Sequence, residues 1–244
     1  LPSLGDFASR RLEGAFIPAW DAWLQEVLQA TRGGLGEGWL DCYLTMPIWR
    51  FVLLPGLVGP HGWAGVLMPS VDRVGRQFPL TLVVALSSYA AVAHAVFHGA
   101  DWFAGLEETA LGALDLTRGP DDLEQSLVDR GFATPETADL DGSDGDAPRR
   151  LPSADKGFEL LAKAEALRAW GRHAGWKGLW WTRGRVDGDP LMLTCAELPT
   201  AEEFGWLLQS RLTLAERPAA AANADAEPTT LISDTSGLPP HATA

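Results

Sequence analysis

The sequence has few cysteines and few basic side chains. Its 244 residues include only Cys42 and Cys195, too few for a disulfide framework or a cysteine-based metal site in a chain of this length. We therefore expect buried, reduced thiols. Nineteen Lys and Arg stand against 32 Asp and Glu, which gives a formal net charge of −13. This balance argues against nucleic acid and anionic membrane surfaces as partners, because both require a basic footprint.

The sequence also lacks a clear membrane-spanning run. The apolar stretch 80–97 is interrupted by Ser87, Ser88 and His94, whereas a span needs about twenty predominantly apolar residues. No signal peptide is visible. The expectation is a cytoplasmic protein that does not insert into a membrane.

Motifs of catalysis are missing as well. His94 and His98 are four residues apart on a predicted helix and could ligate a metal, but position 95 is alanine where a zincin helix carries its glutamate base. No serine stands in a G-x-S-x-G elbow. The glycine-rich stretch 33–38 lacks the Lys-Ser/Thr ending of a phosphate-binding loop. We therefore expect no metal site, no cofactor and no enzymatic activity.

Tryptophan, by contrast, is abundant: there are eleven, against two tyrosines. Most are expected in the core, because an indole brings a large apolar area and a single donor, although some could anchor an interface. Helical spacing predicts an amphipathic helix that starts near Pro18, ends at the Gly33–Gly34 pair and packs on a sheet. Its predicted buried stripe is Trp20, Trp23, Leu24, Val27 and Leu28.

The remaining periodicity predicts strands and further helices. Predicted strands cover 48–54, 63–68, 80–86, 179–182 and 191–195, and predicted helical segments cover 88–116, 121–129, 158–170 and 201–212. In the second of these helical segments, Asp121 and Asp122 are expected to cap the start. This order favours an α+β fold, with a single mostly antiparallel sheet of about five strands covered by helices.

The composition also divides the chain. We expect one domain over 1–214, with a mobile insertion at 131–155, where prolines, glycines and aspartates replace large apolar side chains. A disordered tail is expected over 215–244. Residues 101–146 hold thirteen Asp or Glu and two Arg, so the acidity of the chain is concentrated there.

The connection between the second and third predicted strands concentrates charge in another way. Asp72, Arg73 and Arg76 stand among turn residues of 69–79, although the first hundred positions hold only thirteen Asp, Glu, Lys or Arg. One interpretation is a loop that presents a guanidinium and a carboxylate to a partner. The other is a brace, in which Asp72 caps the turn and pairs with an arginine. Spacing alone leaves both open.

Six motifs follow one another along the chain. They are LPSLGDFASRRL at 1–12, WDAWLQ at 20–25, YLTMPIWRFVLLPG at 43–56, MPSVDRVGRQFPLTL at 68–82, WFAGLEETALGAL at 102–114 and GLWWT at 178–182. Together they resemble the TagF family, also called ImpM, which accompanies bacterial type VI secretion systems. Such proteins usually open with a short aromatic and glycine-containing lead-in, whereas this sequence starts at Leu1. We therefore expect an edge strand to be missing.

The resemblance implies a longin- or profilin-like fold and a function. TagF-like proteins are post-translational repressors of type VI secretion, and in some systems they bind the forkhead-associated scaffold protein. Some relatives are fused to a metal-dependent serine/threonine phosphatase, which this sequence does not contain, so any phosphatase is expected to be a separate protein. Two alternatives remain: a structural adaptor of the secretion apparatus, and an enzyme with a site around Asp72, Arg73, Arg76 and the Trp180–Trp181 pair.

The resemblance also points to partner-binding residues, because its most distinctive motifs hold both the charged loop and a tryptophan pair. Residues adjacent on a strand point to opposite faces, so one tryptophan is expected in the core and the other on the outer face or under a helix. If the outer one stood beside the arginine loop, the two would form an aromatic and guanidinium anchor. The predicted partner-binding residues are Ser70, Asp72, Arg73, Arg76, Trp180 and Trp181.

Overall fold

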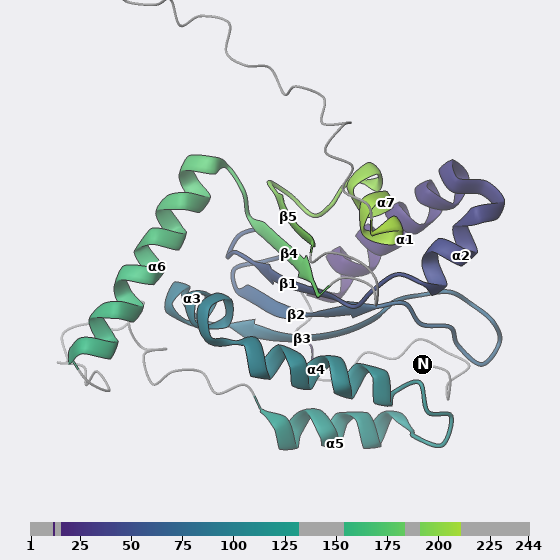
Figure 1. Ribbon diagram of the computed structural model, residues 1–244, viewed down its shortest axis with the longest axis horizontal. Coiled ribbons are helices and arrows are strands. Elements are labelled where there is room, and N and C mark those ends of the chain that lie inside the picture. Colours follow the sequence, from purple (N-terminus) through teal and green to yellow (C-terminus); the bar gives the residue numbers. More distant parts are fainter. Residues whose placement is uncertain (1–11, 13–15, 132–153, 184–190, 211–244) are drawn as a thin grey trace, which may run out of the picture. The chain divides into compact units, whose positions relative to one another are not determined.

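Figure 1 shows the computed structural model, in which five antiparallel strands form one sheet with helices on both faces. This arrangement confirms the predicted α+β class. The structure describes residues 12, 16–131, 154–183 and 191–210. All of these belong to one compact unit, Leu1–Leu212.

The sheet has the strand order β3-β2-β1-β4-β5, and each neighbouring pair is antiparallel. The strands are β1 (Trp49–Leu53), β2 (Gly62–Met68), β3 (Leu80–Leu86), β4 (Gly178–Thr182) and β5 (Leu191–Cys195). Their bounds agree with the predicted strands to within one residue. The sequence therefore located the strands well, because each is a short apolar run bounded by glycine, proline or polar residues.

Both faces of the central strands β1 and β2 are buried, and β1 shows how its side chains alternate between the two faces. Trp49, Phe51 and Leu53 lie in the hydrophobic cluster shared with α1, α2 and α7, whereas Val52 lies in the cluster shared with α3 and α4. Figure 1 shows these two sets of helices on opposite sides of the sheet. The helices are α1 (Phe16–Leu35), α2 (Trp39–Leu44), α3 (Tyr89–His98), α4 (Ala100–Gly112), α5 (Pro120–Arg130), α6 (Ala154–Ala174) and α7 (Ala201–Gln209), with a short 3-10 turn η1 (Gly36–Gly38).

The predicted stripe of α1 is confirmed. All five of its residues are buried against the sheet and α7: Trp20, Trp23, Leu24, Val27 and Leu28. The predicted stop at Gly33–Gly34 is wrong, because α1 continues to Leu35. A glycine inside a helix costs only about 1 kcal/mol, and the chain turns instead at Gly36, whose φ of +54° suits a residue without a side chain.

Buried tryptophans join elements that are distant in the sequence, as the predicted aromatic core requires. The indole N–H of Trp23 in α1 donates to the carbonyl oxygen of Pro199 at 2.7 Å, and that of Trp49 in β1 donates to the carbonyl oxygen of Leu207 in α7 at 3.1 Å. Each indole thus buries its apolar area and satisfies its donor. These bonds tie α7 to both α1 and the sheet.

The predicted helical segment 88–116 is two helices, and its boundaries differ from the expectation. α3 and α4 meet at Gly99, where a Cβ atom would collide with the carbonyl oxygen of Ala95, so only glycine fits without a shift. Ser88 caps α3 by accepting the amide of Ala91 at 3.1 Å. At the start of α5, the carboxylate of Asp122 accepts the amide of Gly119 at 2.8 Å.

The outer helices pack on other helices. α5 contacts α4, and α6 contacts α3. The helix α6 begins at Ala154, four residues before the predicted start at 158, so the end of the predicted 131–155 insertion is helical. Three other expectations lie outside the described residues: the rest of that insertion (132–153), the disordered tail over 215–244, and the edge strand expected to be missing. None of the described helices is long and apolar enough to cross a membrane.

Candidate functional site

The charged connection between β2 and β3 is a tight, hydrogen-bonded turn. An isolated bridge pairs Val71 with Gln77, and the amide of Asp72 donates to the carbonyl oxygen of Arg76 at 3.0 Å. The chain reverses at Gly75, whose φ is +86° and whose amide donates to the carbonyl oxygen of Asp72 at 3.0 Å. We call residues 69–79 the arginine loop. Its backbone bonds hold the tip in a defined place.

The carboxylate of Asp72 organises this turn. Its Oδ1 atom accepts the amides of Val74 at 2.9 Å and Arg76 at 2.8 Å, and its Oδ2 atom accepts Nε of Arg76 at 2.6 Å. Partial desolvation by itself would raise the pKa of Asp72, but the hydrogen bonds from Arg76 and Val74 outweigh it and lower that pKa below its usual value. Asp72 and Arg76 therefore form the brace that was one of the two interpretations of this loop: Asp72 caps the turn and pairs with an arginine.

Arg73 and Val74 are placed differently, at the tip of the arginine loop. Both are exposed, and Val74 is 64% exposed. No described residue forms a hydrogen bond or ion pair with the guanidinium of Arg73. The brace therefore presents a cation and an aliphatic side chain to solvent.

Ser70 lies inside the protein, at the base of the loop. It is buried, and its Oγ atom has no hydrogen-bond partner among the described residues. Its backbone is held by Tyr43 of α2: the hydroxyl donates to the carbonyl oxygen of Ser70 at 2.8 Å and accepts its amide at 3.1 Å. Burial raises the pKa of Tyr43, so the hydroxyl keeps its proton. Ser70 was predicted to touch a partner, and in this structure its side chain is enclosed.

A third arginine, from α1, contacts the arginine loop. Nη2 of Arg32 donates to Oε1 of Gln77 at 3.1 Å, and the guanidinium carbon lies 4.2 Å from the ring centroid of Trp39. Sequence reasoning missed Arg32, because 45 residues separate it from Gln77. This contact couples the end of α1 and the start of α2 to the loop.

The tryptophan pair of β4 points to opposite faces, as predicted. Trp180 is completely buried and stacks on Trp20 with ring planes 7° apart. Trp181 lies on the other face, with its ring edge-on to Phe103 of α4 at 4.9 Å. Trp181 does not stand beside the arginine loop. Val71 and Phe78 of that loop pack in the hydrophobic cluster on one face of the sheet, whereas Trp181 packs in the cluster on the other face. Trp180 is thus a core residue, and Trp181 is partly buried against the cluster on the α4 side.

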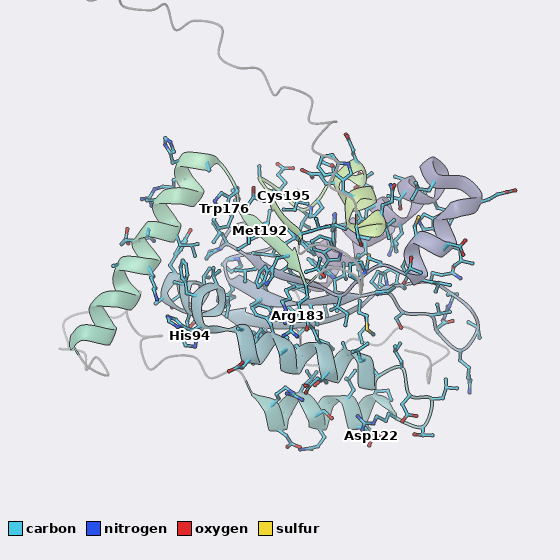
Figure 2. All side chains as sticks on the ribbon, viewed as in Figure 1. His94, Asp122, Trp176, Arg183, Met192 and Cys195 are labelled. Atoms are coloured by element: carbon cyan, nitrogen blue, oxygen red, sulfur yellow. The ribbon has the colours of Figure 1, made fainter. Side chains whose placement is uncertain are left out.

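A buried ion pair, also missed from the sequence, fixes α4 on that second face. Arg50 of β1 is 6% exposed, and its Nε and Nη2 atoms contact Oε1 and Oε2 of Glu107 at 2.6 and 2.9 Å. Nε of Arg183, at the end of β4, lies 3.7 Å from the same carboxylate (Figure 2). An arginine within the apolar strand β1 was the signal that a buried carboxylate would face it.

The two histidines of α3 lie near each other, and one of them contacts a lysine. Their ring centroids are 5.5 Å apart, and Nε2 of His98 lies 3.1 Å from Nζ of Lys163 in α6, on the side of α3 where Figure 2 labels His94. Burial, with the nearby His98, lowers the pKa of His94. Within the described residues, no group of three or more His, Cys, Asp or Glu could hold a metal ion.

Both cysteines are free thiols, and a groove lies on the side of the sheet that α1 and α7 cover. Cys42 and Cys195 are free, and burial raises the pKa of Cys195 to about 12. A groove of about 430 Å³ runs between α1, the β1–β2 connection and the start of α7, and its lining includes Trp23, Leu57 and Lys177. None of the six predicted partner-binding residues lines it.

Comparisons with known proteins agree with this fold. The model of the TagF N-terminal domain, described as type VI secretion system-associated, matches residues 1–129. The crystal structure of PA0076 from Pseudomonas aeruginosa PAO1 is similar over 85% of this chain and 90% of that chain, with 32% sequence identity and a TM-score of 0.65. No curated protein matches. Because the family model covers more than half of the sequence, the chain belongs to the TagF family of type VI secretion system-associated proteins.

Proposed function

We propose that this protein is a non-enzymatic, post-translational repressor of type VI secretion that acts in the cytoplasm by binding the forkhead-associated scaffold protein. Its membership of the TagF family supports this function. The binding residue that we propose is Arg73, with Val74 beside it. The proposal depends most on one observation: Arg73 is exposed at the tip of the arginine loop, and none of the residues that the structure describes pairs with its guanidinium.

Rigidity supports the assignment. Three hydrogen bonds to the Asp72 carboxylate and the Val71–Gln77 bridge fix the turn before any partner arrives. A pre-organised loop loses less conformational entropy on binding than a flexible one. An arginine with its donors unused can pair with a carboxylate through two parallel hydrogen bonds, and the exposed valine adds apolar area beside it.

The test separates binding from folding. Arg73→Ala is expected to keep the stability of the wild type, as exposed substitutions usually do, and to lose capture of the scaffold protein in a pull-down. Arg172→Ala removes another exposed arginine, at the end of α6, and is the matched control. If Arg73→Ala captures the scaffold as well as the control does, the tip is not the binding site.

Secretion distinguishes repression from the adaptor alternative. Deleting a repressor raises secretion, whereas deleting a component of the apparatus abolishes it. We expect the deletion strain to secrete under conditions in which the parent strain is silent. We also expect the Arg73→Ala variant to reproduce that phenotype at wild-type protein levels. Loss of secretion in the deletion strain would favour the structural adaptor.

A further inference from the structure

The exposed face of α4 carries both acidic and leucine side chains. Asp101, Glu108 and Leu111 recur at intervals of seven and three residues, so they follow one face of the helix. The opposite side holds Phe103 and Ala110, which are buried against the sheet. Leu111 is 53% exposed, and the side chain of Glu108 is 73% exposed. Most of this face is therefore open to solvent, although Arg130 of the neighbouring α5 pairs with Glu108.

Exposed leucines continue along the chain past the end of α4. Leu114 and Leu116 are 45% and 73% exposed, and Asp115 stands between them. The amide of Leu114 donates to the carbonyl oxygen of Leu111 at 3.0 Å, so these two leucines sit on consecutive turns of the chain. We call the set the α4 ridge: Asp101, Glu108, Leu111, Leu114, Asp115 and Leu116.

Both components of the ridge narrow the choice of partner. Single exposed leucines are ordinary, but a group of them rimmed by charged groups marks a surface that another molecule covers. Apart from Glu107, whose charge Arg50 compensates, residues 100–131 hold seven Asp or Glu against Arg118 and Arg130, a balance of −5. The negative electrostatic potential of these residues attracts cationic partners and repels acidic ones.

We infer that the α4 ridge is a docking surface for a basic amphipathic segment of a protein partner. The cationic side chains of that segment would pair with Asp101, Glu108 and Asp115, and its aliphatic side chains would pack on the three leucines. A helix that alternates apolar and basic faces has this chemistry. This docking surface is independent of the proposed function. The cation of the arginine loop suits an acidic partner surface, whereas the α4 ridge suits a basic one.

The first experiment uses a synthetic peptide of about 18 residues, with leucines on one helical face and lysines on the other. Its binding to the full chain is followed by fluorescence anisotropy, with a peptide of the same composition in scrambled order for comparison. Leu111→Ser combined with Leu114→Ser is expected to weaken binding of the ordered peptide at least about tenfold. Met192→Ser removes an equally exposed apolar side chain from β5, labelled in Figure 2, and is expected to leave binding unchanged.

A charge variant gives a second, independent readout. Glu108 forms only an exposed ion pair with Arg130, and such pairs contribute little to folding. Glu108→Lys is therefore expected to fold, to bind the ordered peptide more weakly and to flatten the salt dependence of binding. Glu202→Lys, at an exposed position of α7, is the matched control.

Three results would overturn the inference. One is a leucine double variant that binds the ordered peptide as the wild type does. Another is equal binding of the ordered and scrambled peptides, which would mean attraction by charge alone. The third comes from sedimentation: self-association of the wild type that disappears in the leucine double variant would mean that a second copy of this chain covers the ridge.

Discussion

The hydroxyl oxygen of Tyr43 lies 2.8 Å from the carbonyl oxygen of Ser70 and 3.1 Å from its amide nitrogen, so one side chain of α2 holds both backbone groups of a residue 27 positions away. This contact fixes the point at which the arginine loop leaves β2. The carbonyl oxygen of Ser70 also accepts the amide of Phe78 at 3.1 Å, whereas the Ser70 amide donates to the hydroxyl of Tyr43.

Tyr43→Phe is therefore expected to leave a buried amide unsatisfied. Because an unpaired buried donor costs about 1 to 3 kcal/mol, the free energy of unfolding should fall by that amount in urea denaturation. Hydrogen exchange at the Ser70 amide should accelerate at the same time. Unchanged stability together with unchanged exchange would show that this hydroxyl does not hold the loop.

Trp23→Ala tests the buried stripe of α1. The indole packs between the sheet and α7 and donates to the carbonyl oxygen of Pro199. Truncating a large buried aromatic costs about 3 to 5 kcal/mol, so thermal or chemical denaturation should show a loss of this size. Met192→Ser, at a position 60% exposed, should stay within about 0.5 kcal/mol of the wild type. Equal effects of the two substitutions would contradict the assignment.

Glu107→Gln tests the buried ion pair. Removing the charge that faces Arg50 leaves a buried guanidinium without compensation, which costs about 3 to 5 kcal/mol when a buried pair is broken. The neighbouring Glu108→Gln breaks an exposed pair and should cost less than about 1 kcal/mol. Combining Arg50→Met with Glu107→Leu should restore most of the stability, since no buried charge remains. If Glu107→Gln and Glu108→Gln destabilise equally, Glu107 does not anchor α4.

The histidines of α3 predict a loss of stability in mild acid. Burial and the neighbouring His98 lower the pKa of His94 below its usual 6.5. As the pH falls, the unfolded chain therefore protonates His94 before the folded chain does. The contribution of neutral His94 to folding stability is complete above about pH 6.5 and is lost as the pH falls through the lowered pKa. Nε2 of His98 is the acceptor in its contact with Nζ of Lys163, because a lysine only donates hydrogen bonds.

Melting temperatures between pH 7 and pH 5 check this expectation. The wild type should lose stability over that range, and a variant with both His94→Gln and His98→Gln should lose less. The lowered pKa of Asp72 keeps that carboxylate charged throughout the range. Parallel pH profiles of the wild type and the double variant would count against a role for the histidines.

The sequence by itself determined the elements and the local contacts. The strand 80–86 and the α1 stripe follow from the spacing of apolar residues, and the Asp72–Arg76 brace joins residues only four apart. The TagF resemblance rested on motifs in order, and the family match over residues 1–129 bears it out. Such features depend on neighbours along the chain, so periodicity and turn chemistry reveal them.

Only the tertiary structure decided which distant groups meet. Arg50 and Glu107 are 57 residues apart, and no spacing rule pairs them. Periodicity says that a residue such as Trp181 faces one side of the sheet, but it does not say which helix covers that side. The separation of the exposed Arg73 from the enclosed Ser70 was likewise decided by packing, because α2 reaches across to the base of the loop and leaves its tip in solvent.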